Sequence, residues 1–372
     1  MNGIEAPFVL STVLAVMLCY TGLLTLFFIL LLLPQKIRPA EIVAAPSLTL
    51  VIPVRNEAGR LRHLAEQYGS QPFRTVVVND RSSDISPEEF LRIFEGSGVE
   101  ACVLHGPPFG KKAAIHSVAE RADSEWILTV DADTTLLPNF IKALPALTDS
   151  NKSAWVLPLR PAFSRSPAGK FFDLEFIALQ AVGLASARGG FPLLANGAAF
   201  LFRREAYLKS LRFRDDFDLD SGDDVFTLHA VARAEGTRSI GAYTEAGPAA
   251  VTLFPEGYRA LKEQRMRWVS KAGDVDSVAF KAVIWLVFFA NLIFVSVSAA
   301  ALLTANFERF AAVVFLKIGP ELVLIARGVL YFRRADLLWW AAPAALIYPF
   351  FFLALIFSAT MRKRRNKDKR HG

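Results

Sequence analysis

Long uncharged apolar runs lie near both ends of this 372-residue chain, and shorter apolar runs alternate with polar segments between them. Residues 8–33 exceed the roughly 20 helical residues that cross a hydrocarbon layer. They predict a transmembrane helix, because the run is too long for a signal peptide and no basic segment precedes it. Residues 278–360 contain similar runs at 282–304 and 337–360. Charges interrupt the run at 311–332, so the pattern leaves two or three C-terminal spans open.

The middle of the chain, residues 34–277, has the pattern of alternating strands and helices. Apolar runs typical of buried strands lie at 48–54, 75–78, 101–104 and 126–130. Strands that alternate with helices predict an α/β domain, in which helices cover both faces of a mostly parallel sheet. Such sheets bind ligands beyond the carboxyl ends of their strands.

The composition indicates a folded domain joined to membrane segments and excludes nucleic acid as a partner. Apolar residues make up 53% of the chain and charged residues 21%. The basic tail, residues 361–372, holds nearly all of the net charge of +7, so no basic surface is left to bind a nucleic acid. Lys36 and Arg38 follow the first apolar run, and the positive-inside rule therefore predicts that the domain 34–277 is cytoplasmic.

The most specific local signal is a pair of carboxylates, Asp131 and Asp133, directly after the predicted strand at 126–130. Hard oxygen ligands suit Mg or Mn, which typically bridges one or two carboxylates to substrate phosphates. The alternative is a turn in which the Asp side chains accept backbone N–H bonds. The two interpretations remain open at this point.

Other polar residues extend the candidate site. Lys111 and Lys112 precede a predicted helix, where at least one ammonium can neutralise a phosphate, and we assign Lys112. Asp80 follows a strand and is a candidate nucleoside contact or part of an Asx turn. Asp223 and Asp224 are adjacent acids, and such neighbours have the raised proton affinity that suits a general base. The alternative interpretation is that the two acids only stabilise the N-terminus of a helix.

A further set of residues lies on one helix face near the C-terminal apolar runs. Gln264, Arg267 and Trp268 are spaced i, i+3 and i+4. An amide, a guanidinium fork and a flat indole on one face can hold a diphosphate and stack an acceptor. The alternative is a membrane-interface helix whose Arg and Trp lie near lipid headgroups.

Taken in order, these residues resemble the membrane-bound branch of glycosyltransferase family 2, which includes cellulose and hyaluronan synthases and ceramide glucosyltransferase. The resemblance covers about residues 47–271. It rests on the segments 51–57, 79–84, 110–113, 131–133, 222–224 and 264–268. It implies a GT-A fold with a mixed, mostly parallel sheet, and inverting transfer from a nucleoside-diphosphate sugar, UDP-glucose by default.

The resemblance also implies roles for the donor-side residues. Glu57 and Asp80 would contact the nucleoside. Asp131 and Asp133 would bind the donor and a divalent metal, Mg or Mn, with Asp133 as the direct ligand.

On the acceptor side, the resemblance makes Asp224 the general base. The family often has Glu-Asp in place of Asp223-Asp224, so which acid acts as the base stays open. Residues 196–198 resemble the small-residue segment that lines the acceptor side. The residues implied to hold diphosphate and acceptor are Gln264, Arg267 and Trp268.

Two other classes of protein use similar residues. Asp131, Asp133 and Thr135 match the Asp-x-Asp-x-Thr pattern of haloacid-dehalogenase phosphatases, in which the first Asp is a nucleophile. We disfavour that class because several strand-helix units precede Asp131. A sugar-nucleotide sensor without catalytic turnover would keep the same fold. We disfavour it because an acidic residue is present at every position where the resemblance expects one.

The membrane segments favour a lipid-like acceptor. A processive polysaccharide synthase needs a channel lined by several helices, and two or three C-terminal spans are few for that purpose. We therefore expect a multi-pass membrane enzyme that uses a hydroxyl of a hydrophobic acceptor in the bilayer, such as a glycerolipid, a sphingolipid or a hydroxylated carotenoid. The processive synthase is the alternative.

Overall fold

The computed structural model describes residues 5–34, 47–214, 216, 222–245, 247–254 and 257–371, with side chains from residue 11 to residue 362. Two compact units divide the chain. The sheet unit lies within residues 34–162 and 186–253, and the helical unit within residues 1–33, 163–185 and 254–372. Lys36, Arg38 and the tail side chains beyond Arg362 lie outside the described residues. The cytoplasmic placement that rests on them remains a prediction.

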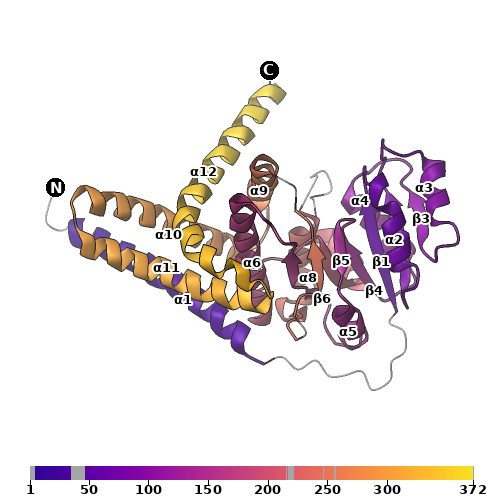
Figure 1. Ribbon diagram of the computed structural model, residues 1–372, viewed down its shortest axis with the longest axis horizontal. Coiled ribbons are helices and arrows are strands. Elements are labelled where there is room, and N and C mark those ends of the chain that lie inside the picture. The colour runs from indigo at the N-terminus through magenta and orange to yellow at the C-terminus, as the bar shows by residue number, and fades with distance from the viewer. Residues whose placement is uncertain are drawn as a thin grey trace. The chain divides into compact units, whose positions relative to one another are not determined.

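The sheet unit alternates strands with helices, as the apolar pattern predicts (Figure 1). Its strands are β1 Leu48–Val54, β2 Arg74–Asn79, β3 Glu100–Val103, β4 Trp126–Val130, β5 Thr134–Leu136, β6 Ala154–Val156, β7 Leu159–Pro161, β8 Ala199–Arg203, β9 Ile240–Ala242 and β10 Ala250–Thr252. Its α-helices are α2 Leu61–Tyr68, α3 Pro87–Phe94, α4 Lys111–Arg121, α5 Pro138–Thr148, α7 Arg204–Ser210 and α8 Asp223–Glu235.

Seven strands form the large sheet in the order β3-β2-β1-β4-β8-β6-β9, and three form a small sheet in the order β5-β10-β7. In the large sheet β1 is parallel to β2 and β4, and β2 is parallel to β3. Strand β8 runs antiparallel to its neighbours β4 and β6. The expected mixed, mostly parallel α/β sheet is therefore confirmed.

The central strands form the core of this unit and bring polar segments to one edge. Leu50, Val77 and Leu128 are fully buried, as expected for parallel strands covered on both faces. Val54 pairs with Asn79 at the carboxyl ends of β1 and β2. The polar segments that follow β1, β2 and β4 therefore emerge at the same edge.

The helical unit consists largely of long helices. They are α1 Glu5–Leu32, α6 Pro167–Arg188 as far as residue 185, α9 Tyr258–Ala272, α10 Val278–Leu303, α11 Phe307–Tyr331 and α12 Leu338–His371. Helices α1, α10 and α11 pack side by side (Figure 1). Among the described residues, three helical segments are long and apolar enough to cross a membrane: 11–32, 278–303 and 335–362.

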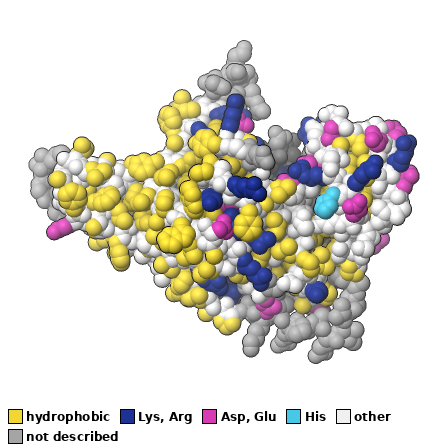
Figure 2. All heavy atoms as spheres, in the orientation of Figure 1, with side chains coloured by type: hydrophobic (Ala, Val, Ile, Leu, Met, Phe, Trp, Pro, Cys, Tyr) yellow, Lys and Arg dark blue, Asp and Glu magenta, His cyan; other side chains and the backbone are white. Residues whose placement is uncertain are grey.

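Hydrophobic side chains cover much of the visible surface of the packed helices (Figure 2). Trp285 and Leu303 of α10 and Phe315 of α11 are exposed. Extended exposed apolar surface on a protein marks membrane or protein contacts. Together with the helix lengths, this surface indicates a multi-pass membrane protein.

The helical unit also contains a buried polar cluster. Lys317 of α11 is fully buried, and its Nζ lies 2.6 Å from Oε1 of Glu321, four residues along the same helix. A spacing of four residues places both side chains on one face of α11. Tyr20 of α1 donates its hydroxyl hydrogen to the same Glu321 oxygen, at 2.5 Å. The pair thus joins α1 to α11, and partnered charges of this kind are tolerated inside a helix bundle.

A proline creates a second link between the same two helices. Pro320 lies inside α11 and has no N–H to donate to the carbonyl of Leu316, four residues earlier. The Thr21 hydroxyl of α1 donates to that carbonyl oxygen at 2.6 Å. A side chain of one helix thus satisfies the group left free in the other.

We expect Thr21→Val to destabilise the contact between α1 and α11, because the Leu316 carbonyl would lose its donor. Hydrogen bonds of this kind contribute about 0.6 and at most about 1.7 kcal/mol, so the thermal unfolding midpoint in detergent should fall slightly. Thr25→Val is the matched control, since Thr25 is exposed and donates to the Thr21 carbonyl of its own helix. Equal effects of the two substitutions would contradict the interhelical role.

Candidate active site

Two loops at the carboxyl edge of the sheet are joined by hydrogen bonds. Asn56, after β1, accepts the backbone N–H of Ser83 on Oδ1 at 2.8 Å and donates its own N–H to the Ser82 hydroxyl at 3.0 Å. The N–H of Ala58 donates to Asp84 at 2.9 Å. Asn56 has a φ of 59°, a backbone conformation that Asn adopts more readily than most residues. The two motif segments thus form one rim.

The predicted nucleoside contacts, Glu57 and Asp80, lie in these two loops. Asp80 is buried, and its carboxylate lies 3.2 Å from Arg81 Nε and 3.9 Å from Arg55 Nη1. Glu57 pairs with Arg60. Burial raises the pKa of both acids after β4, Asp131 and Asp133, and the charge of Glu57 makes a smaller contribution in the same direction. The edge therefore brings Glu57 close to those acids.

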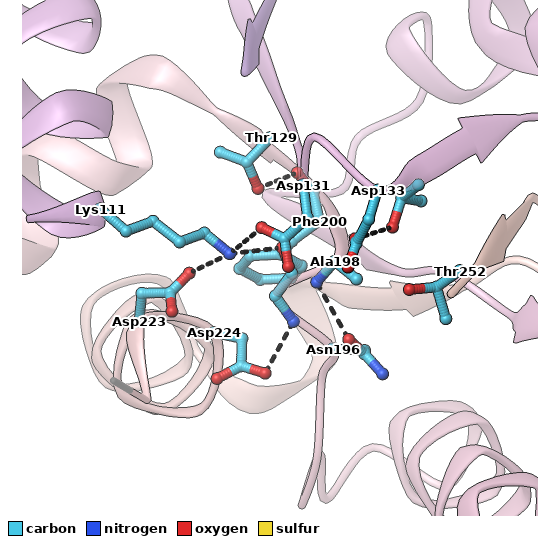
Figure 3. Close-up of polar contacts among 12 residues, drawn as sticks. Lys111, Thr129, Asp131, Asp133, Asn196, Ala198, Phe200, Asp223, Asp224 and Thr252 are labelled. Atoms are coloured by element: carbon cyan, nitrogen blue, oxygen red, sulfur yellow. Dashed lines mark hydrogen bonds and ion pairs between the residues drawn. The ribbon is translucent and has the colours of Figure 1, made fainter. Parts of the chain in front are cut away.

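Lys111 is the central cation of the site (Figure 3). Its Nζ lies 2.6 Å from Asp131 Oδ1 and 3.1 Å from Asp223 Oδ2. It also donates to the carbonyl oxygen of Gly197 at 2.8 Å. An ammonium has three hydrogens, and here they have three acceptors from three segments: the end of β4, the start of α8 and the loop before β8.

Asp224 is hydrogen-bonded to the same loop that contains Gly197. Its Oδ2 accepts the backbone N–H of Gly197 at 2.7 Å, and its Oδ1 accepts the N–H of Val225 at 2.8 Å. A Cβ at residue 197 would lie 3.0 Å from Lys111 Nζ and 3.1 Å from Asp223 Oδ2, so a larger residue there would require these two side chains to shift. The predicted small-residue segment 196–198 thus lies directly against the charged cluster.

Burial and mutual charge shift the pKa values of this cluster. Burial opposes the charge of Lys111, but Asp131 and Asp223 outweigh it and raise the pKa of the ammonium. Burial and the neighbouring charge of Asp223 raise the pKa of Asp224 to about 6, and Lys111 opposes this shift. A carboxyl group with such a pKa is suited to accept a proton near neutral pH.

Asp133, two residues after Asp131, is the predicted metal ligand. Its Oδ1 accepts the Thr134 hydroxyl hydrogen at 3.3 Å, and burial together with the charge of Asp131 raises its pKa. Within the described part of the chain, no group of three His, Cys, Asp or Glu side chains is arranged to hold a metal ion. Two neighbouring carboxylates nevertheless fit Mg or Mn, since these ions complete their coordination with water and substrate phosphates.

Lys112 does not join this cluster. Its side chain is buried, and its Nζ lies 2.6 Å from Asp216. Lys111 therefore has the position that the sequence argument gave to Lys112. Helical periodicity does not separate the two lysines, because buried residues of α4 lie at i+3 and i+7 from both: Ala114 and Val118 from Lys111, and Ile115 and Ala119 from Lys112.

The other predicted face, formed by Gln264, Arg267 and Trp268, belongs to helix α9 of the helical unit. Arg267 and Trp268 are exposed and Gln264 is half-buried. The intervening Arg265 is buried and pairs with Glu175 of α6, Nε to Oε2, at 2.7 Å. Arg265 also donates to Gln264 Oε1 at 2.5 Å and lies 4.5 Å from the centre of the Trp268 ring. It thus supports two residues of the face, a contact that the motif spacing did not predict.

Sequence comparison matches one segment of the chain to a known family. Residues 49–209 match the family described as "Glycosyl transferase family 2". This segment of the chain therefore resembles glycosyltransferase family 2. The matched segment runs from β1 to α7 and includes Lys111, Asp131 and the Gly197 loop. The match favours a glycosyltransferase domain over the phosphatase alternative, because the matched segment contains the pair Asp131 and Asp133.

Curated relatives are distant. An N-acetylglucosaminyltransferase of Mesorhizobium japonicum is 26% identical over 256 residues, which cover 63% of this chain and 58% of the relative. A 4,4'-diaponeurosporenoate glycosyltransferase of Staphylococcus aureus is 25% identical over 260 residues, covering 64% of this chain and 66% of the relative. The chain thus spans less than two thirds of the length of these relatives.

A solved structure with the same fold supports the architecture. The mannosyltransferase PcManGT of Pyrobaculum calidifontis, in complex with GDP-Man and Mn2+, aligns with 96% of this chain and 99% of its own, at a TM-score of 0.53 and 18% identity. At that identity the likeness concerns the fold alone. The expected GT-A fold is confirmed.

We expect Glu175→Gln to destabilise the helical unit, because Arg265 would keep a buried charge without its counter-charge. Breaking a buried ion pair in this way costs roughly 3–5 kcal/mol, which thermal unfolding in detergent can detect. Glu263→Gln is the matched control, since Glu263 pairs with Arg259 on the exposed side of α9 and such pairs contribute at most about 1 kcal/mol. Similar losses in the two variants would contradict a structural role for the buried pair.

Proposed function

We propose that this protein transfers a hexose, with inversion, from a UDP-sugar to a hydroxyl of a lipid-like acceptor in the membrane. The observation that supports the proposal most directly is the arrangement of Asp131, Asp223 and Asp224 around Lys111 at the carboxyl edge of the sheet. The three candidate membrane helices support the choice of acceptor.

Asp131 and Asp133 would hold a divalent cation, Mg or Mn, together with the diphosphate of the donor. When bound, such an ion neutralises charge that develops on the departing diphosphate. Lys111 keeps the carboxylates of Asp131 and Asp223 in place and offsets their charge. Without this offset, the acids would repel the diphosphate. Glu57 and Asp80 would contact the nucleoside at the rim.

Asp224 would act as the general base and take the proton of the acceptor hydroxyl as its oxygen attacks the anomeric carbon. Its pKa of about 6 suits this role, and two backbone N–H groups fix the carboxylate orientation. Asp223 differs from Asp224 in that it forms an ion pair with Lys111. For the face of Gln264, Arg267 and Trp268 we keep the diphosphate- and acceptor-binding role that the family resemblance implies.

The nature of the acceptor rests on two observations. The helical unit presents exposed apolar side chains, including Trp285 and Phe315, so a hydrophobic acceptor can reach the protein from the bilayer. The name of the Staphylococcus aureus relative specifies a carotenoid acid as its acceptor. We place the sheet unit on the cytoplasmic side, where nucleotide sugars are available, in line with the positive-inside rule.

Membranes that contain the protein should transfer label from a UDP-sugar to a lipid-soluble product when Mg or Mn is supplied. UDP-glucose, UDP-N-acetylglucosamine and GDP-mannose are compared as donors, and the product is separated into lipid-soluble and polymeric fractions. Asp224→Asn should abolish transfer and retain donor binding. A ladder of long glycans would favour the processive synthase instead, and the absence of nucleoside-diphosphate release with all donors would refute the proposal.

The pH dependence of kcat/KM should identify the base. Asp224 must be deprotonated to accept a proton, so the rate should be high above about pH 6 and fall about tenfold per pH unit below it. Asp223→Asn removes the neighbouring negative charge that raises the pKa of Asp224. The fall in rate at acidic pH should therefore begin at a lower pH in this variant. If Asp223→Asn instead abolishes transfer and Asp224→Asn does not, the base is Asp223.

A further inference from the structure

A buried charge network lies beside the candidate active site and has no role in the chemistry proposed above. It consists of Lys112, Arg214 and Asp216, whose side chains are 5%, 2% and 2% exposed. Asp216 Oδ1 accepts from Arg214 Nε at 2.8 Å, and Oδ2 accepts from Arg214 Nη2 at 2.9 Å. Lys112 Nζ lies 2.6 Å from both Oδ2 and the backbone oxygen of Asp216. Every member of the network is thus held by at least two hydrogen bonds.

The buried charge network joins the two helices whose first residues form the active site. Lys112 is the second residue of α4 and follows Lys111 directly. Arg214 donates from Nη1 to the hydroxyl of Thr227 at 2.7 Å, and Thr227 lies one turn after Asp223 in α8. Asp216 therefore connects the start of α4 to the first turns of α8.

Two adjacent lysines thus form ion pairs on different sides of the first turn of α4. Successive residues of a helix point about 100° apart, so Lys111 reaches the carboxylates while Lys112 reaches the interior. The Lys112 ammonium also lies 5.1 Å from the centre of the Phe226 ring, in α8. A lysine enclosed in this way is not accessible to a donor phosphate, but it restricts how α8 can move against α4.

We propose that Lys112, through Asp216 and Arg214, is a positioning residue that holds α8 so that Asp224 is correctly placed to act as the base. The proposal rests on the function proposed above. It assigns different effects to two neighbouring lysines. Loss of Lys111 leaves acids uncompensated beside the diphosphate and should weaken donor binding. Loss of Lys112 should leave donor binding intact and slow the transfer step, since small misplacements of a catalytic group cost up to about a hundredfold in rate.

The test compares Lys111→Met, Lys112→Met, Lys112→Arg and Asp216→Asn in the full chain. The affinity and stoichiometry of UDP binding are measured by calorimetry in the presence of Mn, and kcat and KM are measured for the donor. The stoichiometry counts folded protein, so a loss of kcat per binding site is not a folding loss. Lys152→Met is the matched control, because the ammonium of Lys152 donates to the Arg238 carbonyl at the protein surface.

We expect Lys112→Met and Asp216→Asn to bind UDP within about twofold of the wild type and to lose about tenfold or more in kcat, with little change in donor KM. Lys112→Arg, which can still donate to Asp216, should recover most of the rate. The double variant Lys112→Met/Asp216→Asn should lose little more than either single variant, because both remove the same connection. Lys111→Met should weaken UDP binding, and Lys152→Met should behave as the wild type.

Two results would overturn the proposal while leaving the proposed function in place. The first is a loss of UDP affinity in Lys112→Met equal to that in Lys111→Met, which would make Lys112 a donor-binding residue. The second is a wild-type kcat per binding site in Lys112→Met. A wild-type protein that neither binds UDP nor turns over a UDP-sugar would refute the proposed function and this inference together.

Discussion

The geometry of the site depends on one ammonium group shared among three chain segments. Lys111 contacts one carboxylate at the end of β4 and another at the start of α8, and it donates to a backbone carbonyl in the loop before β8. Without that positive charge, Asp131 and Asp223 would repel each other across the same space. The attraction to a common cation overcomes this repulsion and fixes the distances within which a donor diphosphate would bind.

Asp224 illustrates how such an arrangement sets proton affinity. It lies beside Asp223, whose charge raises its pKa, and within reach of Lys111, whose charge lowers it. The hydrogen bonds from Gly197 and Val225 hold the carboxylate in one orientation. Burial, charge and backbone donors together bring the pKa to a value useful near neutral pH.

The helical unit uses polar contacts in a different way. Lys317, Glu321 and Tyr20 pair within the helix bundle, and Thr21 satisfies the carbonyl that Pro320 leaves free. Arg265 and Glu175 pair beneath the exposed face of α9. In surroundings without water an unpaired polar group is costly, so these contacts specify which helices pack together. The exposed apolar side chains leave the outer surface free to face lipid.

The sequence alone predicted the sheet, the long apolar helices and the resemblance to glycosyltransferase family 2. Buried parallel strands require continuous apolar runs, and residues 48–54 and 126–130 coincide with β1 and β4. It also located Asp131, Asp223 and Asp224, because strand ends and helix starts are visible as local patterns. The choice between Lys111 and Lys112 needed the tertiary structure. Both are lysines at one helix start, and only the packing of α4 decides which one reaches the acids. The partners of Arg265 and Asp216 come from distant segments, and contacts between such segments leave no local pattern in the sequence.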